Sequence, residues 1–167
     1  MTSVERDWSN ELALRVGCRE MGGWLQELGQ WLGAPADFLP TRAGPFHELK
    51  NPAKGIGVQL HDPEPQDGGI TSREAWVLYN VEIEAEKIKL PFDLDPLRDT
   101  PDRCRTKLSD NARIAKRLTT NDLKPSVTYY LDDARVVAVQ FKRGLVGIQL
   151  VRLARLFDWP NWSDISK

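Results

Sequence analysis

The stretch "SVTYYLDDARVVAVQFKRGLVGIQLVRLARLF", residues 126–157, decides the fold class. It contains three runs rich in valine, leucine, tyrosine and phenylalanine, at 126–131, 135–142 and 145–153. Side chains of this kind that recur every second residue are typical of a β-strand with one buried face. The breaks between the runs, Asp132-Asp133 and Arg143-Gly144, are short enough for tight turns. The sequence therefore predicts three consecutive antiparallel strands.

The same period of two occurs earlier in the chain. "GIGVQLHD" begins at Gly55 and "AWVLYNVEIEAEK" begins at Ala75, and the loop-like "PEPQDGG" at 63–69 lies between them. These segments predict two further strands. We expect the alternating apolar residues of both strand groups to share a core: Val77, Tyr79, Val81, Val137, Val139 and Phe141.

Helices are predicted in two places. From Ser9, apolar residues recur at steps of three and four up to Leu32, which predicts two helices, or one helix kinked at Gly22-Gly23, ending by Gly33. The second place is a helical stretch from about Pro101 to Leu118. Residues 34–54, with four prolines, are predicted to be a connection.

The predicted fold is α+β: an antiparallel sheet of about five to six strands, with the N-terminal helices and one mid-chain helix packed on it. A chain of 167 residues suits one domain, so we expect residues 1–167 to form a single unit.

The composition is that of a globular protein, with 41% hydrophobic and 28% charged residues. Cys18 and Cys104 belong to no metal-binding or redox motif, which favours a reducing compartment. The N-terminal residues lack the apolar run of a secretory signal, and no stretch approaches the roughly 20 apolar residues that span a bilayer. We therefore expect a cytoplasmic protein without membrane contact.

The formal net charge is −1, but the charges are segregated along the chain. Residues 61–102 carry eleven acidic and four basic side chains, a balance of −7, whereas residues 103–155 carry four acidic and twelve basic ones, a balance of +8. Such a division predicts either two oppositely charged binding surfaces or two parts of the fold that neutralise each other.

No catalytic motif is present, so we expect no enzyme activity, cofactor or metal site. His47 and His61 have no partner at metal-ligand spacing. Glu82, Glu84 and Glu86 share one face of a predicted strand, but no glycine-rich loop or histidine accompanies them. A cluster of six basic residues could bind the phosphates of a nucleic-acid backbone. No aromatic residues interleave with it, so we expect no nucleic-acid partner. Its members are Arg103, Arg105, Lys107, Arg113, Lys116 and Arg117.

Residues 54–153 together resemble bacterial toxin immunity proteins, the antidotes of effectors in interbacterial competition such as those of type VI secretion or polymorphic toxin systems. Four segments carry the resemblance: the strand "GIGVQL", the "LPFDL" that follows a strand, the short helix "DRCRTKLS" and the hairpin "VTYYLDDARVVAVQF". Members of this family often show Leu-Pro-Phe-Gly-Leu, and here Asp93 replaces that glycine.

The resemblance implies a protein that binds the C-terminal toxin domain of a cognate effector and occludes its active site. Toxins that degrade nucleic acid have basic clefts, which acidic loops can occupy as a phosphate substitute. The predicted partner-binding residues are Asp62, Glu64, Asp67, Glu82, Glu84, Glu86, Asp93, Asp95, Asp99 and Asp102.

Two alternatives remain open at the level of sequence. A secretion-associated adaptor or chaperone would use the apolar stripe around Trp24, Leu28 and Trp31, and an enzyme would use a carboxylate site of unrecognised type.

Overall fold

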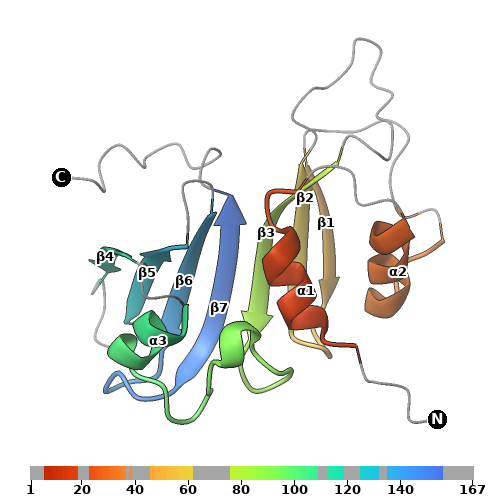
Figure 1. The fold of residues 1–167 in the computed structure, drawn as a ribbon. Helices are drawn as coiled ribbons and strands as arrows, with labels where there is room; N and C mark the ends of the chain where they lie inside the picture. Colours follow the sequence, from red (N-terminus) through yellow and green to blue (C-terminus); the bar gives the residue numbers. More distant parts are fainter. Residues whose placement is uncertain are drawn as a thin grey trace.

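The computed structural model describes residues 6–18, 23–36, 38, 46–61, 76–108, 113–118, 125–131 and 135–155. Figure 1 shows the elements in chain order. They are α1 (Trp8–Arg15), α2 (Gly23–Leu32), β1 (Phe46–Asn51), β2 (Ile56–His61), β3 (Val77–Glu84), the 3-10 turn η2 (Pro91–Asp93), α3 (Pro101–Leu108), β4 (Arg113–Leu118), β5 (Ser126–Tyr130), β6 (Arg135–Phe141) and β7 (Ile148–Arg155).

The strands form one sheet in the order β1-β2-β3-β7-β6-β5-β4, and every neighbouring pair is antiparallel. The predicted α+β class is confirmed, as are the N-terminal helices and the mid-chain helix. The sheet has seven strands in the described residues, more than the five to six expected. β3 and β7 are neighbours, so they join the two strand groups into one sheet.

The two additional strands are the sheet's edges, β1 and β4. β1 lies within residues 34–54, where a connection was expected, because "FHELKN" lacks the apolar alternation of a strand with a buried face. β4 lies where the mid-chain helix was expected to continue to Leu118, but α3 ends at Leu108. The run "RIAKRL" is too short for its apolar spacing to distinguish a helix from a strand, and pairing with β5 determines its conformation.

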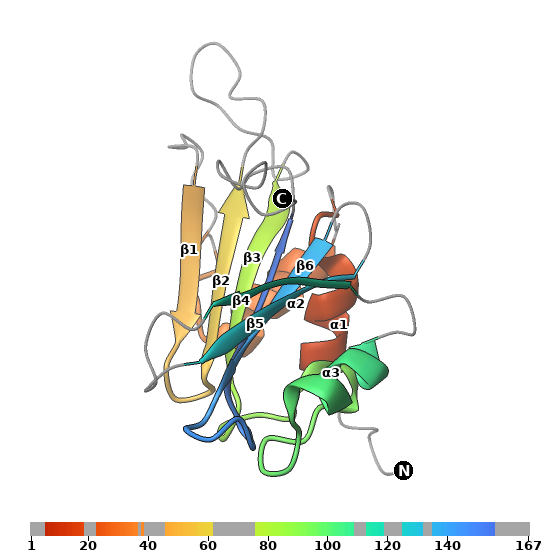
Figure 2. The same cartoon turned by 90° about the vertical axis from the view of Figure 1, so that its left-hand side faces the viewer.

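One face of the sheet carries the hydrophobic core. A row of partners in register crosses six strands, and all its members are buried: Leu49, Val58, Val81, Leu153, Val137 and Tyr129. Figure 2 shows α1 and α3 on the same side of the sheet. Buried apolar residues of the three described helices belong to the same core cluster as this row, so these helices cover this face.

The N-terminal stripe of tryptophans is part of this core. Trp24 and Leu28 of α2 are buried. Trp31 stacks on Trp8 of α1 with ring centroids 4.9 Å apart. The ammonium of Lys54 lies over the Trp31 ring, 4.9 Å from its centroid. Glu11 accepts a hydrogen bond of 2.7 Å from the Trp24 indole. Aromatic packing thus joins the two helices, which are separate rather than one kinked helix.

The predicted common core needs one correction, at the start of β3. Val81, Val137, Val139 and Phe141 belong to the core cluster, but Tyr79 is only partly buried and Val77, although buried, lies outside that cluster. A register shift causes this difference: Gln59 pairs with Asn80 whereas Leu60 pairs with Leu78. The extra residue on β3 reverses the alternation, as β-bulges do.

Candidate partner-binding surface

The face of the sheet opposite the helices has no described helix on it. We call it the open face, and the residues that define it at the β1-β2-β3-β7 end are Glu48, Lys50, Gly57, Gln59, Asn80, Glu82 and Arg152. Strand alternation places them there, because their neighbours along each strand are the buried core residues. Seven paired strands give this surface a rigid backbone.

Ion pairs cover the open face and the strand end next to it. Glu82 pairs with Arg152 on β7 at 2.8 Å, and Glu48 pairs with Lys50 at 2.8 Å. The carboxylates remain accessible, since the Glu82 and Glu48 side chains are 43% and 44% exposed. The hydrogen bond from Lys50 to Glu48 raises the pKa of Lys50. Both signs of charge are therefore present and solvated.

The two other glutamates of the predicted row lie toward the end of β3. Glu84, at the last position of the strand, pairs with Lys87 at 2.8 Å. Glu86, just beyond the strand, pairs with Lys142 at 2.7 Å, and that hydrogen bond lowers the pKa of Glu86. Solvated pairs of this type contribute little to stability, so their cations can be exchanged.

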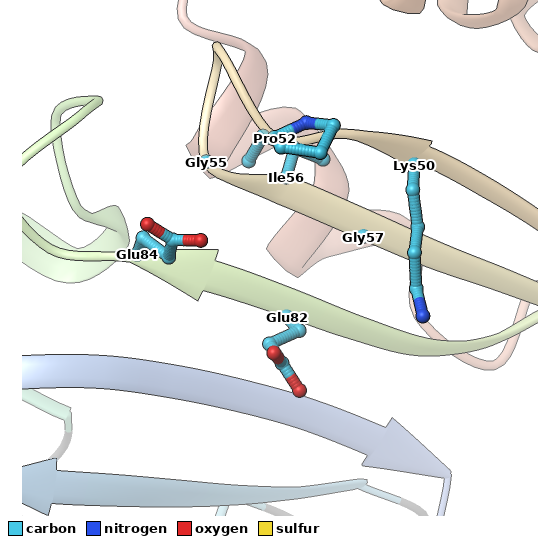
Figure 3. Close-up of a pocket in the computed structure, with 7 residues that line it drawn as sticks. All are labelled: Lys50, Pro52, Gly55, Ile56, Gly57, Glu82 and Glu84. Carbon is cyan, nitrogen blue, oxygen red and sulfur yellow. The ribbon is translucent and has the colours of Figure 1, made fainter.

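A hollow lies in the open face above Gly57. Gly57 is in register between Lys50 on β1 and Glu82 on β3, and it has no side chain to fill the space between them. Two adjoining hollows, of about 80 and 250 Å³, share these three residues. Figure 3 shows the Lys50 and Glu82 side chains on either side of Gly57 in the smaller one.

The larger hollow is lined by Asn80, a residue with an unsatisfied polar atom. Asn80 donates to Gln59 through its Nδ2 at 3.3 Å, but its Oδ1 is buried and has no hydrogen-bond partner in the described part of the chain. An unsatisfied buried acceptor costs about 1 to 3 kcal/mol. The buried Oδ1 is closed to solvent as it stands, so Asn80 can accept a hydrogen bond from a molecule in the hollow once its amide turns.

The acidic connection between β3 and α3 is partly structural, and Asp99 is its centre. Asp99 is 1% exposed. Its Oδ2 accepts hydrogen bonds from the Asp95 backbone at 2.7 Å and from Lys107 at 2.9 Å. Lys107 also donates to the Asp93 carbonyl. Asp99 was predicted to bind a partner, but its burial removes it from the surface, because the chain needs its carboxylate to hold this turn.

Asp93, Asp95 and Asp102 lie nearer to solvent. Asp95 accepts from the backbone of Leu97 at 2.8 Å and of Arg98 at 3.2 Å, and the bond from Leu97 is the main cause of its lowered pKa. Asp93 and Asp102 are exposed. Exposed bases share this region, namely Arg98, Arg103 and Arg105, so the connection is mixed in charge rather than acidic throughout.

Three of the predicted partner-binding residues, Asp62, Glu64 and Asp67, lie outside the described residues. Of the other seven, Glu82, Glu84 and Glu86 follow one another along and just past β3, and Asp93, Asp95, Asp99 and Asp102 lie in the next connection and the first turn of α3.

Burial shifts the pKa values of Cys104 and His47 toward the neutral form of each side chain. Burial raises the pKa of the Cys104 thiol to about 12, so this cysteine is a poor nucleophile at neutral pH. Burial lowers the pKa of His47. In the described part of the chain no three His, Cys, Asp or Glu side chains are grouped so that they could hold a metal ion. None of the described helices has the length and apolar content needed to cross a bilayer.

Comparison of the chain with protein-family models, with curated proteins and with solved structures found no match. The fold and the surface described above therefore carry the functional argument.

The sequence did not reveal the hollow, because its residues come from four strands. Glu48 and Lys50 belong to a strand that was expected to be a connection, and Arg152 is distant in sequence. One signal was available: a glycine within a strand pattern, as at Gly57, often marks a place where another group approaches the backbone closely.

Proposed function

We propose that this protein is an immunity protein, which binds and neutralises the toxin domain of a cognate bacterial effector by occluding its active site. A toxin that acts on nucleic acid in the cytosol is the class that best suits carboxylates at the binding surface. The proposal adds no catalytic step, because the protein acts by occupying the toxin.

One observation carries the proposal: the apolar stripe faces inward while the carboxylates of β3 face outward. Trp24 and Leu28 are buried in the core. Glu82 and Glu84 remain 43% and 46% exposed on a rigid sheet. A surface that is charged, rigid and free of described helices favours binding of another charged protein.

Exchange of ion pairs explains how such a surface can bind tightly. Each exposed pair contributes little within the free protein. When a basic toxin covers the face, its lysine and arginine side chains replace the internal cations in a drier environment, where charge pairs are stronger. Complementary charge also accelerates the encounter. The open face can therefore lose its internal pairs at low cost and gain stronger ones.

The adaptor alternative loses support from the same observation. An adaptor or chaperone needs an accessible apolar surface, and the stripe that would supply it packs between α1, α2 and the sheet. For the enzyme alternative, the carboxylates of β3 have basic partners and no described nucleophile beside them. Turnover of a nucleotide, peptide or sugar substrate that one glutamine substitution abolished would support it.

The proposal is tested with the protein encoded by the gene next to the one for this chain. The C-terminal domain of that neighbouring protein is expressed in a bacterial host under an inducible promoter, alone and together with this protein. Rescue of growth, together with a complex of the two purified proteins, supports the proposal. Growth arrest that persists although the protein is present in soluble form contradicts it, as does the absence of toxicity and of a complex.

A further inference from the structure

We propose that the hollow over Gly57 is a specificity pocket that receives an arginine side chain of the partner protein. That the partner is a protein rests on the proposed function. The chemistry of the pocket depends on this chain alone.

The size of the hollow suits a side chain. The larger part measures about 250 Å³, and the smaller part of about 80 Å³ adjoins it through Lys50, Gly57 and Glu82. One water molecule occupies about 30 Å³ in the liquid, so the space is larger than a single solvent molecule needs. Its floor is the backbone of β2 at Gly57, which is fixed by pairing with β1 and β3.

The carboxylates around the two hollows can accept hydrogen bonds from a further donor. Those of Glu48, Glu82 and Glu84 line the hollows together with the bases Lys50 and Arg152, and Glu84 pairs with Lys87. Lys50 engages Glu48 through Oε1, and Arg152 engages Glu82 through Oε2. A carboxylate has about four lone-pair sites, so both retain capacity to accept further hydrogen bonds.

The unsatisfied Oδ1 of Asn80 also lacks a hydrogen-bond donor in the described residues, and Asn80 lines the larger hollow. The terminal torsion of asparagine is soft, so the amide can turn toward an entering group. A guanidinium has five N–H donors in a planar fork and can serve a carboxylate and an amide oxygen together, which an ammonium does less well.

Gly57 provides a variant that fills the pocket and leaves the fold intact. A Cβ at this position would lie 3.7 Å from Lys50 Cγ and 3.8 Å from Glu82 Cβ, which is ordinary contact. Its backbone lies in strand β2, where β-branched residues are favoured over glycine. Gly57→Ala and Gly57→Val should therefore fold at least as well as the natural chain. Gly23→Ala in α2 is the matched control, because a Cβ there meets nothing within 4 Å.

The first experiment uses N-acetyl-L-arginine amide as the probe and follows backbone amides by NMR. We expect a dissociation constant on the order of millimolar, as befits a ligand of this size. The shifts should centre on Gly57, Asn80 and Glu82, and Gly57→Val should weaken binding at least tenfold while Gly23→Ala leaves it unchanged. Equal binding of the uncharged isostere N-acetyl-L-citrulline amide, or undiminished binding to Gly57→Val, would overturn the proposal.

The second experiment measures affinity for the neutralised toxin. Gly57→Val should weaken it at least tenfold and Gly57→Ala less, with no loss of melting temperature. Full affinity in Gly57→Val overturns the pocket while the proposed function stands. If the natural chain neutralises no toxin, the proposed function fails, and the arginine probe still decides whether the pocket exists.

Discussion

At the scale of single residues, the connection after β3 combines backbone strain with a buried charge. Phe92 and Asp93 have φ values of 60° and 54°, in the left-handed region that favours glycine. Asp99 and Lys107 form the buried pair that holds the turn. These two features lead to separate predictions about stability.

Asp93→Gly is expected to stabilise the protein. A residue with a Cβ in left-handed conformation costs about 1 to 2 kcal/mol, and the added freedom of glycine in the unfolded chain offsets part of the gain. The net gain should be about 0.5 to 1 kcal/mol, or roughly 1 to 4 °C in melting temperature for a chain of this size. Asp93→Asn, which removes only the charge, serves as the control and should change little. A fall in melting temperature for Asp93→Gly would show that the aspartate side chain stabilises the turn.

Lys107→Met is expected to destabilise the protein more than Asp99→Asn. Lys107→Met leaves Asp99, which is almost fully buried, as an unpaired charge. Asp99→Asn leaves Lys107, whose side chain is 32% exposed and can turn to solvent. We expect a loss of about 3 kcal/mol for Lys107→Met and about 1 to 2 kcal/mol for Asp99→Asn in chemical denaturation. The double variant should be more stable than the sum of the two losses implies. A larger loss of stability for Asp99→Asn than for Lys107→Met would contradict the view that Asp99 is a buried charge that needs Lys107.

At the scale of elements, the sequence predicts those strands that have one buried face. β2, β3 and the run β5 to β7 alternate because the helices cover one side of them. The edge strands β1 and β4 could not be predicted. The run of β1 contains Leu49 as its one described core residue, and the short run of β4 takes its conformation from pairing with β5. The hollow depends on cross-strand register, and the bulge near Gln59 alters that register locally. The burial of Asp99 was missed because its partner lies eight residues away on α3.

The N-terminus of α1 leads to a prediction about acid stability. Burial alone would raise the pKa of Asp7, but hydrogen bonds from Lys89, Asn10 and Ser9 outweigh it and lower the pKa to about 2. A carboxyl whose folded pKa is depressed stabilises the fold above its unfolded value, and that stabilisation is lost as the pH falls toward 2.

We therefore expect Asp7→Asn, which can still cap the helix, to lose fewer degrees of melting temperature between pH 4 and pH 2 than the natural chain, by about 2 to 4 °C. Melting curves across this range provide the measurement. Identical pH dependence of the two proteins would show that the pair with Lys89 does not stabilise the fold.

At the scale of the whole molecule, the two faces of the sheet differ in what they carry. One face holds the core and all three described helices, and the open face holds solvated charges around a hollow. The segregation of charge along the sequence is largely compensated where it can be followed, since Glu82, Glu86 and Asp99 all pair with bases from the second half of the chain. Compensation in the free protein and binding to a basic partner are compatible, because exposed pairs exchange at low cost.

The most direct test measures two quantities on the same variant, Glu82→Gln/Glu84→Gln/Glu86→Gln. These are the melting temperature and the affinity for the toxin domain with which the proposed function is tested. If the open face and the adjoining end of β3 capture a basic toxin, the dissociation constant should rise at least a hundredfold and association should slow at low salt. The melting temperature should change by less than about 4 °C. Unchanged affinity with a lower melting temperature would contradict the account, since the carboxylates would then serve only to balance the charges of their own chain.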